Sequence, residues 1–155
     1  MIARESKIGG TDAGYTILEV LIVLVVLAAS AAIVAPRVSA SRDASVLEGA
    51  GARLAAAMAV ARASSISGSS PRYFILDPAR RAYGADREKP LKKLAPGIAM
   101  SASGFPSELG NARMHVRFNP DGTATGGAII LRKSRSAISI SVDWLTGAVR
   151  IKRLG

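Results

Sequence analysis

Side chains that commonly perform catalysis are scarce in this chain of 155 residues. It contains no cysteine and one histidine, His115. It therefore lacks the ligands for a thiolate metal site and the partners for a histidine-based triad. It also lacks a Gly-x-x-x-x-Gly-Lys phosphate-binding loop. Four aspartates fall in expected turns, where aspartate is favoured for local hydrogen bonds: Asp77, Asp86, Asp121 and Asp143. We therefore expect no enzyme, no catalytic residue, no metal site and no cofactor.

One acidic residue, Glu19, lies in an otherwise apolar run. From Tyr15 to Ala35 the only polar residues are Thr16, Glu19 and Ser30. A charged group costs ~2.5–3.5 kcal/mol at the centre of a membrane helix, and less near its end. Glu19 is therefore either hydrated at the membrane interface or paired with a positive group. The run contains no lysine or arginine. If the chain were cleaved after Gly14, the candidate partner would be the new amine of Tyr15, in the same chain or in a neighbour.

The apolar run is long enough to cross a membrane, because a hydrocarbon core of ~30 Å needs about 20 helical residues. A retained anchor, a secretory signal peptide cut after Val38-Ser39-Ala40 and a buried core helix are the alternatives. The run lacks the polar face of a core helix. The first 14 residues carry Arg4 and Lys7 against Glu5 and Asp12, so they lack the charge of a signal peptide. We expect an anchor that crosses the membrane once.

The start of this run carries a motif. Gly14-Tyr15-Thr16-Ile17-Leu18-Glu19-Val20 resembles the class III leader of type IV pilins and type II secretion pseudopilins. The resemblance implies that a prepilin peptidase cleaves between Gly14 and Tyr15 and that Tyr15 is then N-methylated. It also implies that Glu19 serves in assembly and that Pro36 kinks the helix. The chain departs from the family in having Tyr15 where phenylalanine or methionine is usual, and in its nearly neutral leader.

The segment after the apolar run predicts a second, amphipathic stretch of helix. Residues 41–67 are rich in alanine and have apolar residues spaced by three and four: Val46, Leu47, Ala50, Leu54, Ala57, Met58 and Ala61. We therefore expect a leader over 1–14, a transmembrane or filament-core helix over 15–36, its amphipathic continuation over 37–68, and a β-rich periplasmic head over 69–155.

Alternation of apolar and polar residues predicts the strands of this head. They are expected at 72–77, 82–84, 97–101, 114–118, 128–131, 136–142 and 148–154. Ile138, Ile140, Val149 and Ile151 should face the core, and Trp144 should pack at the edge of the sheet or contact a partner. The expected fold class is α+β and type IV pilin-like, with a long N-terminal α-helix packed on one antiparallel sheet.

The order of the C-terminal motifs is similar to GspH/FimT-type pseudopilins. It consists of Phe-Asn-Pro-Asp-Gly at 118–122, Gly-Gly-Ala-Ile-Ile-Leu at 126–131, Ile-Ser-Ile-Ser-Val at 138–142 and Leu-Thr-Gly-Ala-Val-Arg-Ile at 145–151. The resemblance implies a minor pseudopilin of type II secretion, a structural subunit near the tip of the periplasmic pseudopilus that helps to export folded proteins across the outer membrane. The implied location is the bacterial inner membrane, single-pass, with the C-terminal head in the periplasm. The implied partners are pseudopilins like GspG, GspI, GspJ and GspK, the prepilin peptidase and secreted exoproteins.

The basic head suggests an alternative function. Residues 37–155 carry 19 basic and 8 acidic side chains, a net charge of +11. A FimT-like minor pilin of a type IV pilus that binds DNA during uptake is the alternative, because cations that contact phosphates bind DNA regardless of sequence. Solubilising charge or attraction to anionic lipid would explain the same composition, and the 5% aromatic content offers few stacking platforms. The candidate contacts to DNA or to a partner are Arg132, Lys133, Arg135, Arg150, Lys152 and Arg153.

Overall fold

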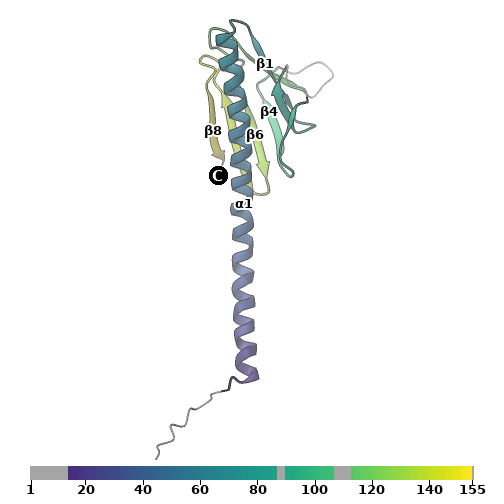
Figure 1. Cartoon of the computed structure of the whole chain (residues 1–155), viewed down its shortest axis with the longest axis vertical. Helices are drawn as coiled ribbons and strands as arrows, with labels where there is room; N and C mark the ends of the chain where they lie inside the picture. The colour runs from purple at the N-terminus through teal and green to yellow at the C-terminus, as the bar shows by residue number, and fades with distance from the viewer. Residues whose placement is uncertain (1–13, 87–89, 107–112, 155) are drawn as a thin grey trace, which may run out of the picture. The chain divides into compact units, whose positions relative to one another are not determined.

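The computed structural model describes residues 14–86, 90–106 and 113–154, and for residues 32–40 it describes the backbone alone. The chain divides into two units, Met1–Arg37 and Val38–Gly155. One helix, α1 (Ile17–Ser67), contributes to both units, and the strands lie in the second (Figure 1).

In the second unit, one face of α1 is buried against the strands. Leu47, Leu54 and Met58 are at most 1% exposed, whereas Arg53 and Val60 on the other face are exposed. The buried residues follow the spacing of three and four that places side chains on one side of a helix. The predicted amphipathic helix is therefore confirmed over residues 41–67.

The helix approaches the strands closely at Gly51. This glycine is buried, and a Cβ atom added to it would collide with the end of the Ile138 side chain. Any larger residue here would force the Ile138 side chain to move, so glycine lets the helix backbone lie this close to the sheet.

The described strands form two antiparallel four-stranded sheets. The first sheet has the order β3-β2-β1-β5 and the second has the order β4-β6-β7-β8. The first contains β3 (Lys92–Lys93), β2 (Ala82–Ala85), β1 (Arg72–Asp77) and β5 (Met114–Phe118). The second contains β4 (Ala99–Ser103), β6 (Gly127–Lys133), β7 (Ser136–Val142) and β8 (Val149–Leu154).

The division into two sheets corrects the expectation of one. β4 pairs with β6 in the second sheet, and β5 returns to pair with β1 in the first. These pairings join segments that are distant in the sequence. Alternation of apolar and polar residues predicts where a strand lies, but it does not show which distant strand it pairs with. The sequence therefore does not predict the division into two sheets.

The observed limits of some strands agree with the prediction, and those of others differ. β1, β5 and β7 have the predicted limits. β6 extends through Lys133 because Arg132 and Lys133 pair with Ala137 and Ser136, which leaves a tight turn of two residues. Ser134 in this turn has a φ of 53°, as hairpin turns of this length require. The short β3 consists of two lysines, which have no apolar alternation to predict it.

The core of the second unit lies between α1 and both sheets. Figure 1 shows α1 running along the second sheet, with β8 on one side of the helix and β6 on the other. The helix, the first sheet and the second sheet each contribute side chains that are at most 1% exposed: Leu54, Phe74, Phe118 and Ile140. Because all three elements share one core, removal of one side chain should affect the whole unit.

Ile151 lies on the predicted inward face but is not buried there, since this side chain is 46% exposed. Ile151 pairs with Ile140 and so shares the helix side of the sheet. However, β8 is the edge strand, and most of its residues remain exposed beyond the cover of the helix. Alternation predicts the face on which a side chain lies, but not whether another element covers that face.

The shared core predicts the result of shortening two side chains of α1. Leu54→Ala should lower the free energy of unfolding by about 2–5 kcal/mol, because it leaves a cavity in a packed core. Val60→Ala is the matched control on the exposed face and should change it by less than about 0.5 kcal/mol. Urea unfolding of the full chain in mild detergent, followed by circular dichroism, measures both. Equal losses in the two variants would contradict the described packing.

Candidate functional site

The predicted cleavage segment lies in open chain just before α1. Gly14, Tyr15 and Thr16 are not helical and are exposed, and Tyr15 is 81% exposed. A Cβ atom added to Gly14 would meet nothing within 4 Å. The peptide bond between Gly14 and Tyr15 is therefore accessible, as a peptidase requires. Its cleavage stays a prediction.

Thr16 caps the helix that begins at Ile17. The amide of Glu19 donates to the Thr16 hydroxyl at 3.2 Å and to the Thr16 carbonyl at 3.1 Å. A threonine followed three residues later by glutamate is the spacing of a capping box. The sequence-based expectations do not include this cap, although the Thr-x-x-Glu spacing carries the signal. Glu19 also lies in the first turn, where the helix dipole favours a negative charge.

The section of α1 over Ile17–Ala31 is apolar on all sides. Its large side chains are all exposed, from 49% at Val20 to 83% at Ile17. The Ser30 hydroxyl donates to the Val26 carbonyl at 2.7 Å, so this polar group is satisfied within the helix. A helix that exposes apolar surface all round needs lipid or other apolar helices around it.

Within the described residues, α1 contains one section that is long and apolar enough to span a membrane, and one shorter apolar section. By length and apolarity alone, Ser41–Ser67 is long enough, whereas Ile17–Ala31 is shorter. A third of the apolar window in Ser41–Ser67 is buried within the molecule, including Leu54 and Met58. We therefore assign Ser41–Ser67 to the folded second unit, where it packs on the sheets. Ile17–Ala31 is the fully described part of the longer apolar run that the sequence predicts as the anchor.

α1 includes Pro36 within its limits. Proline has no amide hydrogen to donate to the carbonyl four residues earlier, which weakens a helix locally. The side chain of Pro36 lies outside the described set, and the kink at this residue stays a prediction.

The six basic candidates separate into groups on the second sheet. Strand pairing places Arg132 beside Ala137, Arg150 beside Ser141 and Lys152 beside Ser139. These residues alternate with the buried Leu131, Ile138 and Ile140, so they lie on the outer face, away from α1. Arg132, Arg150 and Lys152 are exposed there, and Arg135 is exposed in the hairpin turn.

The other two basic candidates connect the sheet to α1. Lys133 Nζ lies 3.3 Å from Asp43 Oδ1, and Arg153 forms an ion pair with Glu48. The Ser134 hydroxyl donates to Asp43 at 2.6 Å. The pKa of the Asp43 carboxyl lies below its ordinary value, mainly because of this hydrogen bond and to a lesser extent because of Lys133. Lys133 and Arg153 therefore have structural partners and do not join the outer basic face.

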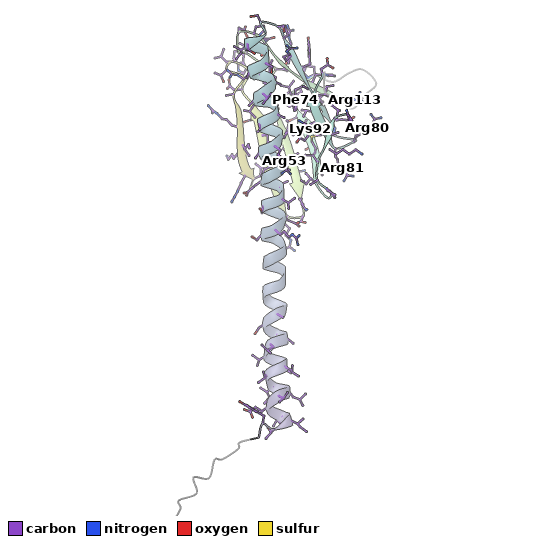
Figure 2. The ribbon with its side chains drawn as sticks, viewed as in Figure 1. Arg53, Phe74, Arg80, Arg81, Lys92 and Arg113 are labelled. Atoms are coloured by element: carbon purple, nitrogen blue, oxygen red, sulfur yellow. The ribbon has the colours of Figure 1, made fainter. Side chains whose placement is uncertain are left out.

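A second group of cations lies on the first sheet. Asp77 is 4% exposed, and its carboxylate accepts from the Arg80 amide at 2.9 Å and from Arg113 Nε at 3.2 Å. Figure 2 shows Arg80, Arg81 and Arg113 together on the side of the head away from α1. The buried carboxylate fixes the turn after β1, and we assign it a structural role.

The turn between β7 and β8 holds two exposed apolar side chains. Trp144 is 66% exposed and Leu145 is 59% exposed, so Trp144 does not pack at the sheet edge as expected. Asp143 Oδ1 accepts from the amides of Leu145 and Thr146 and from the Thr146 hydroxyl. The Thr146 amide and then its hydroxyl lower the pKa of the Asp143 carboxyl.

The same turn is fastened to α1 and to the loop before β6. Arg62 Nε donates to the Thr146 carbonyl at 3.0 Å. Gly147 has a φ of 61°, and an added Cβ atom would lie 2.5 Å from the Gly122 carbonyl oxygen. Since both the backbone angle and the space require glycine, this turn has a defined conformation.

These features together define a class of protein. An apolar helical section follows an open peptide segment, and the same helix continues into a section packed on antiparallel sheets. The chain has an α+β, type IV pilin-like fold.

Comparisons with known proteins show which members of this class the chain resembles. The chain is 27% identical over 143 aligned residues to type II secretion system protein H of Xanthomonas campestris pv. campestris, covering 88% of this chain and 81% of that protein. Its structure is similar to the minor pseudopilin EpsH of the Vibrio cholerae type 2 secretion system, with a TM-score of 0.51, 10% identity and coverage of 69% of this chain and 96% of EpsH. The type IV minor pilin FimU of Pseudomonas aeruginosa gives a TM-score of 0.48 at 17% identity, covering 70% of this chain and 93% of FimU. No family model matches the chain. The predicted resemblance to GspH-type minor pseudopilins is confirmed.

Proposed function

We propose that this protein is a GspH-like minor pseudopilin, a structural subunit near the tip of a type II secretion pseudopilus that helps to export folded proteins across the outer membrane. The observation that carries the proposal is the apolar section Ile17–Ala31, which is exposed all round and has an acidic residue in its first turn. Such a helix is suited to move from lipid into a bundle of similar helices, because its backbone hydrogen bonds remain satisfied in both surroundings. The similarity to type II secretion protein H supports the choice of system.

The proposed processing begins with removal of residues 1–14 by a prepilin peptidase. The exposed bond between Gly14 and Tyr15 supports this step. Cleavage would give Tyr15 a new amine, which is then N-methylated. The mature chain would hold a transmembrane helix over 15–36, the amphipathic continuation over 37–68 and the head over 69–155. It would cross the inner membrane once with its head in the periplasm.

Glu19 would act during assembly by neutralising an amine. A carboxylate that moves into an apolar bundle is costly unless it is paired. The Tyr15 amine of a neighbouring subunit would provide a positive charge near the start of a parallel helix. Since the pair forms at one axial offset, it would fix the register between subunits.

A pseudopilin associates with other pseudopilins, and the proposed neighbours are subunits like GspG, GspI, GspJ and GspK. The prepilin peptidase is a transient partner, and exported proteins are further proposed partners. The role of the chain is structural, so no catalytic step is assigned to it.

The assembly role of Glu19 can be separated from helix capping with two variants. Glu19→Ala should leave the protein in the membrane but reduce its recovery with the other pseudopilins roughly tenfold, equivalent to an ion pair worth about 1.4 kcal/mol. Thr16→Ala removes the capping hydroxyl and keeps the acid, so it is the matched control and should retain most recovery. Affinity isolation from cells that express the whole secretion system measures both. Equal recovery of Glu19→Ala and wild type would contradict the proposed role.

A second candidate function, DNA binding by a FimT-like minor pilin, is supported by the outer basic face. Arg132, Arg150 and Lys152 project from the same open side of the second sheet, among serine and alanine side chains. Cations and hydroxyls on one face suit contact with successive phosphates. Binding of this kind would be independent of sequence and sensitive to salt.

Charge reversal on this face tests the second candidate. A triple variant with Arg132→Glu, Arg150→Glu and Lys152→Glu should abolish the gel shift of duplex DNA by the full chain in detergent at low salt. The matched control has the same change in net charge at Arg53→Glu, Arg81→Glu and Lys93→Glu, and it should retain most of the shift. Absence of a shift with the wild-type chain, or an equal loss in both triple variants, would exclude this binding face.

A further inference from the structure

The second sheet has an open edge at β8. In the described part of the chain β8 pairs with β7 alone, and it is the last strand in the order of its sheet. Ile151 is 46% exposed and Leu154 is 38% exposed, so this edge combines unpaired main chain with apolar side chains. The corresponding edge of the first sheet is covered, because β5 bonds to the Thr125 amide and to the Pro106 carbonyl.

The pairing with β7 determines which main-chain groups point outward. The Asp143 amide donates to the Ala148 carbonyl at 2.9 Å, so the Ala148 carbonyl points toward β7. Main-chain groups alternate in direction along a strand. Those of Arg150 and Lys152 therefore also point toward β7, whereas those of Val149, Ile151 and Arg153 point to the open edge. These three residues form a row of main-chain donors and acceptors available to another strand.

The side chains of β8 differ between its two faces. Val149, Ile151 and Arg153 pair with Val142, Ile140 and Ile138 and lie on the helix side, where Arg153 meets Glu48. Arg150 and Lys152 lie on the outer face and are exposed. An added strand would thus meet an apolar residue, Ile151, on one face and two cations on the other.

This charge pattern selects the kind of strand that fits. A second copy of β8 would bring arginine and lysine opposite each other, and like charges in opposite positions are destabilising. Basic residues on an edge strand oppose such self-pairing. A strand with acidic residues beside Arg150 and Lys152, and apolar residues beside Ile151, would pair both faces favourably.

We propose that the open edge of β8 binds an extended segment of a partner protein, in which acidic residues alternate with apolar ones, by antiparallel strand addition. The main-chain groups of Val149, Ile151 and Arg153 give the affinity, and the cations of the outer face select the acidic residues. The apolar residues of the segment cover Ile151. This surface belongs to the head and does not depend on the proposed membrane anchor or on filament assembly.

A pair of N-methylated peptides tests the main-chain pairing without altering the protein. The probe is a fluorescein-labelled peptide of alternating valine and glutamate, bound to the full chain in detergent and followed by fluorescence anisotropy. In antiparallel pairing the residue opposite Ile151 exchanges both hydrogen bonds with it. Methylation of the valine amides should therefore weaken binding by roughly tenfold or more. Methylation of the glutamate amides, which point away from β8, should leave the affinity nearly unchanged.

Variants of β8 test the same contacts from the protein side. Ile151→Pro removes an amide that points outward and bonds to no other strand, so it should weaken peptide binding while the circular dichroism spectrum stays unchanged. Ile151→Val keeps the amide and is the matched control. The double variant Arg150→Glu and Lys152→Glu should lose the valine–glutamate peptide and bind a valine–lysine peptide instead. Equal affinity for the two methylated peptides, their reverse order, or equal binding of the acidic and basic peptides by the wild-type chain would overturn the proposal.

Discussion

The first half of α1 exposes apolar side chains on every side, and the rest of this molecule depends on this property. Side chains from Ile17 to Leu27 are exposed and almost all apolar. No polar face directs this section toward water on one side and a core on the other, so it requires apolar surroundings on every side. A bilayer and a bundle of similar helices both provide them, and exchange between the two keeps every helical hydrogen bond. In the proposed assembly, the Glu19 carboxylate would add specificity between helices whose apolar surfaces are otherwise alike.

The second half of the same helix has one buried face and one exposed face. Its buried face packs into a core shared with two sheets, and Gly51 allows its backbone to approach β7. Asp43 and Glu48 add ion pairs to Lys133 and Arg153 at the rim of this contact. One continuous element therefore carries both a surface for lipid or helices and a surface for a folded head. The head in turn exposes an outer basic face, an open strand edge and the turn with Trp144, which are surfaces suited to other partners.

The sequence predicts those features that depend on local patterns. Apolar spacing identifies the buried face of α1 at Leu47, Leu54 and Met58, and alternation gives the limits of β1, β5 and β7. The Gly14–Glu19 motif predicts a processing segment, and the structure places the peptide bond between Gly14 and Tyr15 in accessible chain.

Features that depend on distant parts of the chain could not be predicted in this way. The order of the strands determines that β4 belongs to the second sheet and β5 to the first. It also places Ile151 on an edge strand, where it is exposed. Lys133 and Arg153 form ion pairs with Asp43 and Glu48, which lie about ninety and one hundred residues earlier, in α1. Composition alone does not show that two of the six basic candidates have these partners. Thr16 differs, because its capping role has a local signal in the Thr-x-x-Glu spacing.

The N-terminus of the mature protein, determined by sequencing and intact mass after isolation from its native membrane, tests the central claim most directly. The account predicts a chain that begins at N-methyl-Tyr15 and retains the whole apolar helix together with its head. A mature chain that begins at Ser41 and is soluble without detergent would contradict it, because the helix that defines the proposed subunit would then be a discarded signal peptide.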